Sequence, residues 1–359
     1  MAKKILVVDD SALMRRVICD IIDSDERFQV VDRATNGLEA FDLLSRNQYD
    51  AVVLDVNMPK MSGLQLLDEL RKNKISAKVM MASTDTKEGA KTTLDALELG
   101  ALDFIHKPDS AVECRVESFK EKLLGTLDVV ANSRPATFSS VSRVQDNRQT
   151  AERMADMAKK FAVKNRGSKI VAIASSTGGP KSLQAVIPRL PAGLDAPVLL
   201  VQHMPKGFTA SLAERLNDIS QLKVKEAQEG EELQNGTVYV SMGGMHMNVK
   251  NLNGTYTIHY SDEPAREGVK PCANYMYESL ADSRFDEIVC VVMTGMGADG
   301  TEGIRNLEAK KKVHVIAQNQ ESCVVYGMPK NVINAGLSDQ IVPLDQLAQE
   351  ITLNVGVKA

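Results

Sequence analysis

Short apolar runs alternate with amphipathic helical patterns along roughly the first 125 residues. The run KILVV (residues 4–8) is followed by ALMRRVICDII (12–22), whose apolar positions recur every three or four residues. Five such runs, separated by helical patterns, predict a parallel sheet with helices on both of its faces. Local signals agree: Ser11 precedes the first helix, and Asn36 with Glu39 resembles a capping box before another.

The alternation stops after about residue 131 and resumes near residue 169. Residues 132–168 are polar, with eight Lys or Arg against three Asp or Glu, and predict a linker. Within it, TAERMADMAKKFA (150–162) is either a partner-binding helix or part of a solvated tether. The runs that follow are KIVAIAS, PVLLVQH, TVYVS, TYTIHY, EIVCVVM and VHVIAQ. We therefore expect an α/β domain at 1–130, a linker at 131–168 and a second α/β domain at 169–359.

Composition narrows the class of protein. Of the 359 residues 43% are hydrophobic and 25% are charged, as in ordinary globular proteins, which excludes a fibrous or wholly disordered chain. No apolar run approaches the ~20 residues that a bilayer requires, and the N-terminus lacks a signal peptide's apolar core. These features predict a cytoplasmic protein without direct membrane insertion.

The net charge and the cysteine pattern argue against further classes of protein. The net charge of −4, with the basic excess confined to the linker, argues against nucleic-acid binding. The five cysteines form no CxxC pair. They predict buried, reduced thiols and neither disulfides nor a zinc site.

Polar residues end the apolar runs of the first domain. Asp9 and Asp10 end the first run, Asp55 the third, Ser83 the fourth and Lys107 the fifth. The carboxyl ends of parallel strands open on one edge, so the three carboxylates should converge and favour Mg²⁺. The hydroxyl and the ammonium would complete a cradle for a phosphoryl group. The alternative for any one aspartate is a simple helix cap.

The motifs VVDDS, LDVNMPKMSG and HKP in this order resemble the receiver domain of bacterial response regulators. The resemblance implies a flavodoxin-like fold with a five-stranded parallel sheet, in which Asp55 accepts phosphate from a chemotaxis sensor histidine kinase. Many receivers have Thr where this chain has His106. The other implied roles are Mg²⁺ ligation by Asp9, Asp10 and Asp55, phosphoryl contact by Ser83 and Lys107, and switching by Phe104.

The second domain offers four histidines as possible general bases. His203 ends the run PVLLVQH and should lie at the carboxyl edge of the sheet. His246, between two methionines after a glycine pair, is its competitor. His259 and His314 lie inside strand patterns and are better explained as structural residues.

A nucleophile and an orienting carboxylate can be placed at the same edge. Ser176 lies in KIVAIASSTGGPKSLQAVI, where a strand meets a helix through a tight turn, which exposes a hydroxyl beside free helix N–H groups. The turn lacks the first glycine of a nucleophile elbow, so a plain capping turn is the alternative. Asp299, in VVMTGMGADGTEG, is by itself a cap, but with Ser176 and His203 it would complete a triad.

The segments ASSTGGP, QHMPKGFTASLAERLN, MTGMGADG and CVVYGMP resemble the catalytic domain of chemotaxis protein-glutamate methylesterases, which also carry an N-terminal receiver. This implies a Rossmann-like, doubly wound domain that needs no cofactor for hydrolysis. Its substrates would be glutamyl methyl esters, and glutamines, on the cytoplasmic helices of methyl-accepting chemoreceptors. Ser175 is a second hydroxyl, but the following TGG places the nucleophile at residue 176. The implied roles are Ser176 as nucleophile, His203 as base, Asp299 as orienter, and the backbone of Thr177 and Met296 as oxyanion donors.

Two other functions are compatible with a receiver. One is a receiver joined to a non-catalytic binding module, which a Ser176→Ala variant would distinguish. The other is a DNA-binding regulator, which the acidic chain and the absence of a basic recognition helix disfavour. With the esterase, we expect a switch in which the unphosphorylated receiver covers the Ser176 edge.

Overall fold

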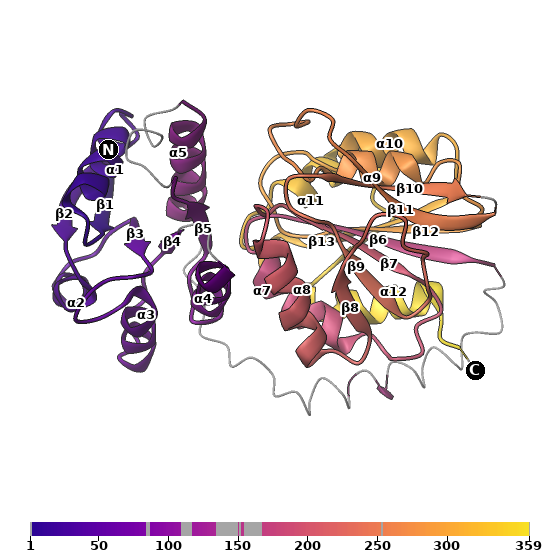
Figure 1. Ribbon diagram of the computed structural model, residues 1–359, viewed down its shortest axis with the longest axis horizontal. Coiled ribbons are helices and arrows are strands. Elements are labelled where there is room, and N and C mark those ends of the chain that lie inside the picture. The colour runs from indigo at the N-terminus through magenta and orange to yellow at the C-terminus, as the bar shows by residue number, and fades with distance from the viewer. Residues whose placement is uncertain are drawn as a thin grey trace. The chain divides into compact units, whose positions relative to one another are not determined.

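The structure, a computed structural model, describes residues 2–83, 87–108, 117–133, 150, 152–153, 167–252 and 254–358. Its contacts divide the chain into two compact units, Met1–Ser140 and Val141–Ala359 (Figure 1). The segment 150–162, for which a partner-binding helix and a solvated tether were the alternatives, lies almost wholly outside the described residues. The expected domain boundaries at 130 and 169 therefore stay predictions.

The first unit contains the predicted five-stranded parallel sheet, in the order β2-β1-β3-β4-β5. The central strands β3 and β4 are buried along their whole length, because helices cover both faces of the sheet. The strands are β1 Lys3–Val8, β2 Phe28–Ala34, β3 Ala51–Asp55, β4 Val79–Ser83 and β5 Asp103–His106.

The helices of the first unit form two groups by their mutual contacts. Helices α1 and α5 pack together, while α3 packs against both α2 and α4 (Figure 1). The bounds are α1 Ala12–Asp23, α2 Gly37–Arg46, α3 Gly63–Lys72, α4 Lys87–Glu98 and α5 Glu117–Asn132.

Two helix caps of this unit were predicted. The Ser11 hydroxyl accepts a hydrogen bond from the amide of Met14 (3.3 Å), and the Asn36 side chain accepts from the amides of Leu38 and Glu39. The capping box expected from Asn36 and Glu39 is wrong in the hydrogen bond that Glu39 accepts. The Glu39 carboxylate accepts from the amide of Thr35 (2.8 Å), one residue before the cap.

The second unit is built on a seven-stranded parallel sheet, in the order β14-β13-β12-β6-β7-β9-β8. From the central β6 the chain first adds strands on the β7 side and later returns to add β12 on the other. The gap between β6 and β12 is thus the topological switch point of a doubly wound sheet. The strands are β6 Lys169–Ser175, β7 Val198–Gln202, β8 Lys223–Glu226, β9 Thr237–Val240, β12 Glu287–Val292, β13 Val313–Gln318 and β14 Gln340–Val342.

Helices lie on both faces of this sheet, with α9, α10 and α11 on one side and α7, α8 and α12 on the other (Figure 1). The α/β class predicted for both halves is confirmed. The bounds are α7 Gly179–Val186, α8 Phe208–Ile219, α9 Ala273–Ser279, α10 Thr301–Glu308, α11 Met328–Asn334 and α12 Leu347–Val355, with short 3₁₀ helices η3 Ile187–Arg189, η4 Gln320–Ser322 and η5 Leu344–Gln346.

One predicted strand lies outside the parallel sheet. TYTIHY falls in β11 (Thr255–Ser261), which pairs antiparallel with β10 (His246–Leu252) in a separate hairpin. Only Thr257 and Ile258 of β11 are buried, and its other residues are partly exposed, as in a hairpin that covers the core without entering the main sheet.

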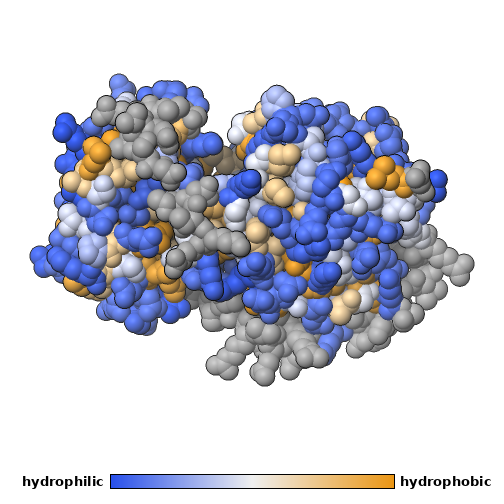
Figure 2. All heavy atoms as spheres, viewed as in Figure 1, coloured by the Kyte–Doolittle hydropathy of each residue, from blue (hydrophilic) through white to orange (hydrophobic). Residues whose placement is uncertain are grey.

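Among the coloured residues on the face shown in Figure 2, hydrophobic residues are scattered among hydrophilic ones. Four cysteines, Cys19, Cys272, Cys290 and Cys323, are buried free thiols, as expected, and Cys114 lies outside the described residues. None of the described helices combines the length and apolar composition needed to cross a membrane.

Candidate functional site

Three carboxylates meet at the carboxyl edge of the first sheet. Asp9 and Asp10 directly follow β1, and Asp55 ends the neighbouring β3. One oxygen from each lies within 4.8 Å of the others, with Asp9 and Asp55 buried and Asp10 exposed. Three carboxylate donors at one edge of the sheet are the hard oxygen ligands that suit Mg²⁺.

Lys107, which follows β5, reaches into this cluster. Its Nζ lies 2.7 Å from Asp55 Oδ1 and 3.1 Å from Asp9 Oδ2. Burial raises the pKa of Asp55 above its usual range, although the ammonium opposes that change. Burial lowers the pKa of Lys107, but the two carboxylates outweigh it and leave that pKa raised.

The other predicted receiver residues, Ser83 and Phe104, lie on β4 and β5. Ser83 is the buried last residue of β4, and its carbonyl accepts a hydrogen bond from the Lys107 amide (2.7 Å). Phe104 is half-buried on β5. The structure therefore gathers the acidic residues and Lys107 into one cluster and places Ser83 at its border.

At the edge of the second sheet the two neighbouring serines differ sharply. Ser175 is fully buried at the end of β6, and its hydroxyl donates to Gln202 Oε1 (2.7 Å). Ser176 is half-buried in the turn before α7, and its hydroxyl makes no hydrogen bond to another described residue. The geometry leaves the hydroxyl of Ser176 available and engages that of Ser175.

His203 stands beside this serine. Strands β6 and β7 pair with Ser175 opposite Gln202, so Ser176 and His203 are the next residues on adjacent strands. The His203 amide also donates to the Ser175 carbonyl (3.0 Å). Parallel strands lie about 4.8 Å apart, which brings the two backbones into neighbouring positions.

The imidazole of His203 is held at one nitrogen. Its Nε2 lies 2.7 Å from Asp299 Oδ2, whereas Nδ1 is buried without a partner among the described residues. In the serine-protease template the aspartate holds Nδ1, so the two nitrogens are exchanged here. An imidazole held by a carboxylate with its other nitrogen free is the arrangement that a general base requires.

Asp299 is buried and accepts four hydrogen bonds. Oδ2 accepts from His203 Nε2 and the Ala273 amide (2.6 Å), and Oδ1 from Cys272 Sγ and the Asn274 amide (both 3.0 Å). Burial raises the pKa of Asp299, but the hydrogen bonds outweigh it, led by that from His203, and leave this pKa below its usual range. The alternative role of Asp299 as a cap of the helix that follows it is wrong, because the N-cap position of α10 is Gly300 and no side chain caps it; Asp299 instead accepts from the first amides of α9.

The segment that carries Met296 closes the site from the β12 side. The Ser176 amide donates to the Thr294 carbonyl (3.0 Å), and a Cβ at Gly295 would lie 2.8 Å from that of Ser176. Residue 295 must therefore be glycine for the loop to approach. The Thr294 hydroxyl donates to the Thr177 carbonyl (3.0 Å). The oxyanion roles of Thr177 and Met296 stay predictions.

The competing histidines have structural surroundings. His246 is fully buried, its Nδ1 accepts from the Cys272 amide, and its Nε2 faces the carbonyls of Glu263 and Pro264. Burial lowers the pKa of His246, which keeps it neutral. His259 pairs with Glu229, and His314 contacts Gln340.

Sequence reasoning missed the polar residues that surround the serine turn and the His203–Asp299 pair. Gln202 bonds to the serine turn, and Cys272 and Asn274 to Asp299. Asn274 Oδ1 in turn accepts from the amides of Gly300 and Gly303, so α9 and α10 cap one another. A glutamine at the end of a buried strand is a signal that could have been noticed, but its partners lie far away in sequence.

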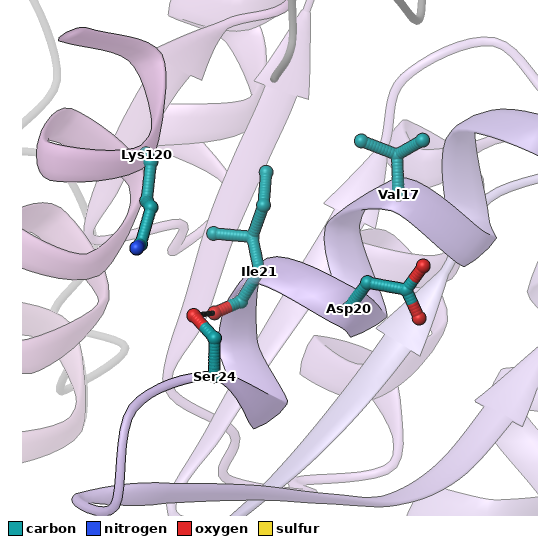
Figure 3. A pocket seen from close by; sticks show the side chains of 5 residues that line it. All are labelled: Val17, Asp20, Ile21, Ser24 and Lys120. Atoms are coloured by element: carbon teal, nitrogen blue, oxygen red, sulfur yellow. Dashed lines mark hydrogen bonds between the residues drawn. The ribbon is translucent and has the colours of Figure 1, made fainter. Parts of the chain in front are cut away.

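A pocket of about 370 Å³ lies between α1 and α5 of the first unit (Figure 3). It is lined by Val17, Asp20, Ile21, Ser24 and Lys120, and the Ser24 hydroxyl donates across its wall to the Ile21 carbonyl (2.7 Å). None of these residues belongs to the acidic cluster or to the serine site.

Comparison with known proteins connects both sites to one family. The sequence model described as CheB methylesterase matches residues 171–351, and that of the response regulator receiver domain matches residues 5–115. A Syntrophomonas wolfei protein named protein-glutamate methylesterase/protein-glutamine glutaminase 1 is 42% identical over 353 residues, 97% of this chain and 98% of the relative. The Bacillus subtilis protein-glutamate methylesterase/protein-glutamine glutaminase is 40% identical over 97% of each chain.

A solved structure agrees for the second unit. The CheB methylesterase catalytic domain of Thermotoga maritima matches with a TM-score of 0.50 and 41% identity, over 52% of this chain and 98% of that chain. The family-model match over residues 171–351 spans the strand ends that carry Ser176, His203 and Asp299. The chain therefore belongs to the CheB methylesterase family, with a response regulator receiver domain in its N-terminal part.

Proposed function

We propose that this chain is a phosphorylation-regulated serine hydrolase that demethylates glutamyl methyl esters on chemoreceptors and deamidates glutamines there, and so controls chemotactic adaptation. The names of its full-length relatives support the activity. The observation that carries the proposal is the His203–Asp299 pair, with Nδ1 of the imidazole without a partner among the described residues and His203 next to Ser176 in the register of β6 and β7.

The proposed reaction has two steps. Ser176 Oγ attacks the ester carbonyl while His203 Nδ1 takes its proton, and the amides of Thr177 and Met296 stabilise the oxyanion. Collapse of this intermediate releases methanol, which takes the proton from His203, and leaves an acyl-Ser176. Water, deprotonated by the same imidazole, then attacks the acyl group and frees the glutamate. With a glutamine substrate the leaving group is ammonia.

Asp299 fits the role of the orienting carboxylate. Its pKa is lowered, so it is ionised at neutral pH and can stabilise the imidazolium that forms when His203 takes the proton. The two amides at the start of α9 and the Cys272 thiol keep its oxygens in place.

The receiver is proposed to supply control. Asp55 would accept phosphate from a chemotaxis sensor histidine kinase, with Ser83 and Lys107 contacting the phosphoryl oxygens. Asp9, Asp10 and Asp55 would hold Mg²⁺, which when bound neutralises charge on the phosphoryl group. The convergence of their oxygens within 4.8 Å supports this assignment. Phe104 is the proposed aromatic switch.

The test is methanol release from methylated receptor in membranes, by the full chain with and without a small phosphodonor. We expect release by both forms and more of it with the phosphodonor. Ser176→Ala should lower the rate by about 10⁴-fold. The same rate from Ser176→Ala as from the unchanged chain would show that the turn is only structural and that the second unit acts as a binding module.

A further inference from the structure

Gln202 is a buried glutamine between the predicted nucleophile and base. It is 2% exposed and ends β7. Its Nε2 donates to the carbonyls of Ser176 (2.9 Å) and His203 (3.2 Å), and its Oε1 accepts from the Ser175 hydroxyl (2.7 Å). One amide group thus joins the backbones of both residues.

The chemistry of the neighbours fixes the orientation of this amide. The carbonyls of Ser176 and His203 can only accept, so the group that faces both must be the NH₂. The oxygen then faces Ser175, whose hydroxyl must donate to it. Ser175 Oγ has consequently committed its proton to Gln202, which is a physical reason for Ser176 to be the nucleophile.

A second observation comes from the turn itself. A Cβ built on Gly179 would lie 1.9 Å from Gln202 Oε1 and 3.1 Å from Ser175 Cβ. Any side chain at position 179 would therefore displace the amide. Glycine at position 179 leaves free the space that the Gln202 amide occupies.

The bridge acts where the backbone ladder of β6 and β7 ends. Up to the Ser175–Gln202 pair the two strands are joined by that ladder, and beyond it the Ser176 amide turns to the Thr294 carbonyl on the β12 side. The two carbonyl contacts of Gln202 keep Ser176 and His203 together past that point. We infer that Gln202 is a positioning residue, which holds nucleophile and base in register without touching the substrate.

This inference rests on the proposed function and is tested with Gln202→Met in the full chain. Methionine keeps the length of the side chain and removes both donors and the acceptor. Since small misplacements of reacting groups are costly, we expect kcat for methanol release to fall about 10- to 100-fold with KM within about twofold. The rate at which a serine-directed phosphonate labels Ser176 should fall in parallel.

The matched control is Gln184→Met. Gln184 is a buried glutamine on α7 whose Nε2 has no partner among the described residues. It should keep kcat within about twofold of the unchanged chain. If Gln202→Met has the kcat and labelling rate of Gln184→Met, the positioning role is wrong. If Ser176→Ala is inactive while Gln202→Met behaves like Gln184→Met, only the positioning role of Gln202 is overturned. If Ser176→Ala is active, the proposed function itself is overturned.

Ser175→Ala keeps the inference testable if Gln202→Met does not fold. It removes only the hydroxyl that anchors the amide oxygen. We expect kcat to fall about 3- to 10-fold with KM unchanged. An unchanged kcat would contradict the anchoring of the Gln202 amide by the Ser175 hydroxyl. A loss of kcat as large as that of Ser176→Ala would identify Ser175 as the nucleophile and overturn the inference.

Discussion

The two carboxylate oxygens of Asp299 accept four hydrogen bonds, which hold this side chain of the serine site firmly in place. Asp299→Asn offers a single acceptor oxygen and places an NH₂ among donors. We expect kcat to fall by about 10⁴-fold, and the free energy of unfolding by about 1–3 kcal/mol. Methanol release and urea unfolding measure the two effects. Glu302→Gln, which changes an exposed carboxylate near the start of α10, is the control and should leave both unchanged.

The same variant has a defined pH dependence. Because the folded-state pKa of Asp299 is below its ordinary value of about 4, its stabilisation is fully present above that value. It is lost as pH falls through the depressed pKa. The difference in unfolding free energy between the unchanged chain and Asp299→Asn should therefore shrink below about pH 4. A constant difference down to pH 3 would contradict the lowered pKa.

The ammonium of Lys107 offsets the negative charge of Asp9 and Asp55 in the receiver. In Lys107→Met, Asp55 keeps the burial and the neighbouring Asp9 that raise its pKa and loses the ammonium that lowers it. A raised carboxyl pKa destabilises the fold once pH exceeds the unfolded value, so the stability deficit should grow from about pH 4 to pH 7. Thermal unfolding over this range measures it, and Mg²⁺ should restore part of the loss. A deficit independent of pH would contradict this account, and Lys72→Met on the surface is the control.

At the scale of elements, α9 and α10 stabilise one another through their first turns. Asn274 Oδ1 accepts from the amides of Gly300 and Gly303, while Asp299 caps α9. Asn274→Ala leaves these two buried amides unpaired and should lower the unfolding free energy by about 1–2 kcal/mol. Denaturant unfolding checks this. Asn306→Ala, at an exposed position of α10, should cost clearly less, and equal losses would refute the capping role.

The elements that sequence patterns predicted are those with a strong periodicity. The long apolar strands such as β6 and β12 are buried on both faces and were visible as continuous runs. The two parallel strands that were missed, β8 and β14, are the edges of the sheet. Edge strands are short and carry charged or polar residues, as in KVKE, so their patterns do not differ from those of loops.

The residues of the two sites also fall into those that a sequence pattern can predict and those that it cannot. Asp9, Asp55, Ser176 and His203 lie at strand ends, and a parallel sheet brings strand ends to one edge, which a sequence can predict. Gln202, Cys272 and Asn274 bond to residues more than 20 positions away, and no local pattern encodes those contacts. Their roles required the register of the sheet and the path of the loops.

At the scale of the whole molecule, the receiver is proposed to restrain the esterase. Removal of residues 1–150 should then raise the basal rate of methanol release. A tenfold effect needs a bias of only about 1.4 kcal/mol between restrained and free forms. Comparison of the truncated and full chains without phosphodonor measures it, with Asp55→Asn as a full-length chain that cannot be phosphorylated there. Equal or lower activity of the truncated chain would exclude restraint.

The most direct test of the central claim is to identify the acylated atom. The full chain is treated with a serine-directed phosphonate, digested and mapped by mass spectrometry, alongside Ser176→Ala and Ser175→Ala. The account predicts one adduct, on Ser176, that is retained in Ser175→Ala and absent from Ser176→Ala. An adduct on Ser175, or a chain that releases methanol while Ser176 stays unlabelled, would contradict it.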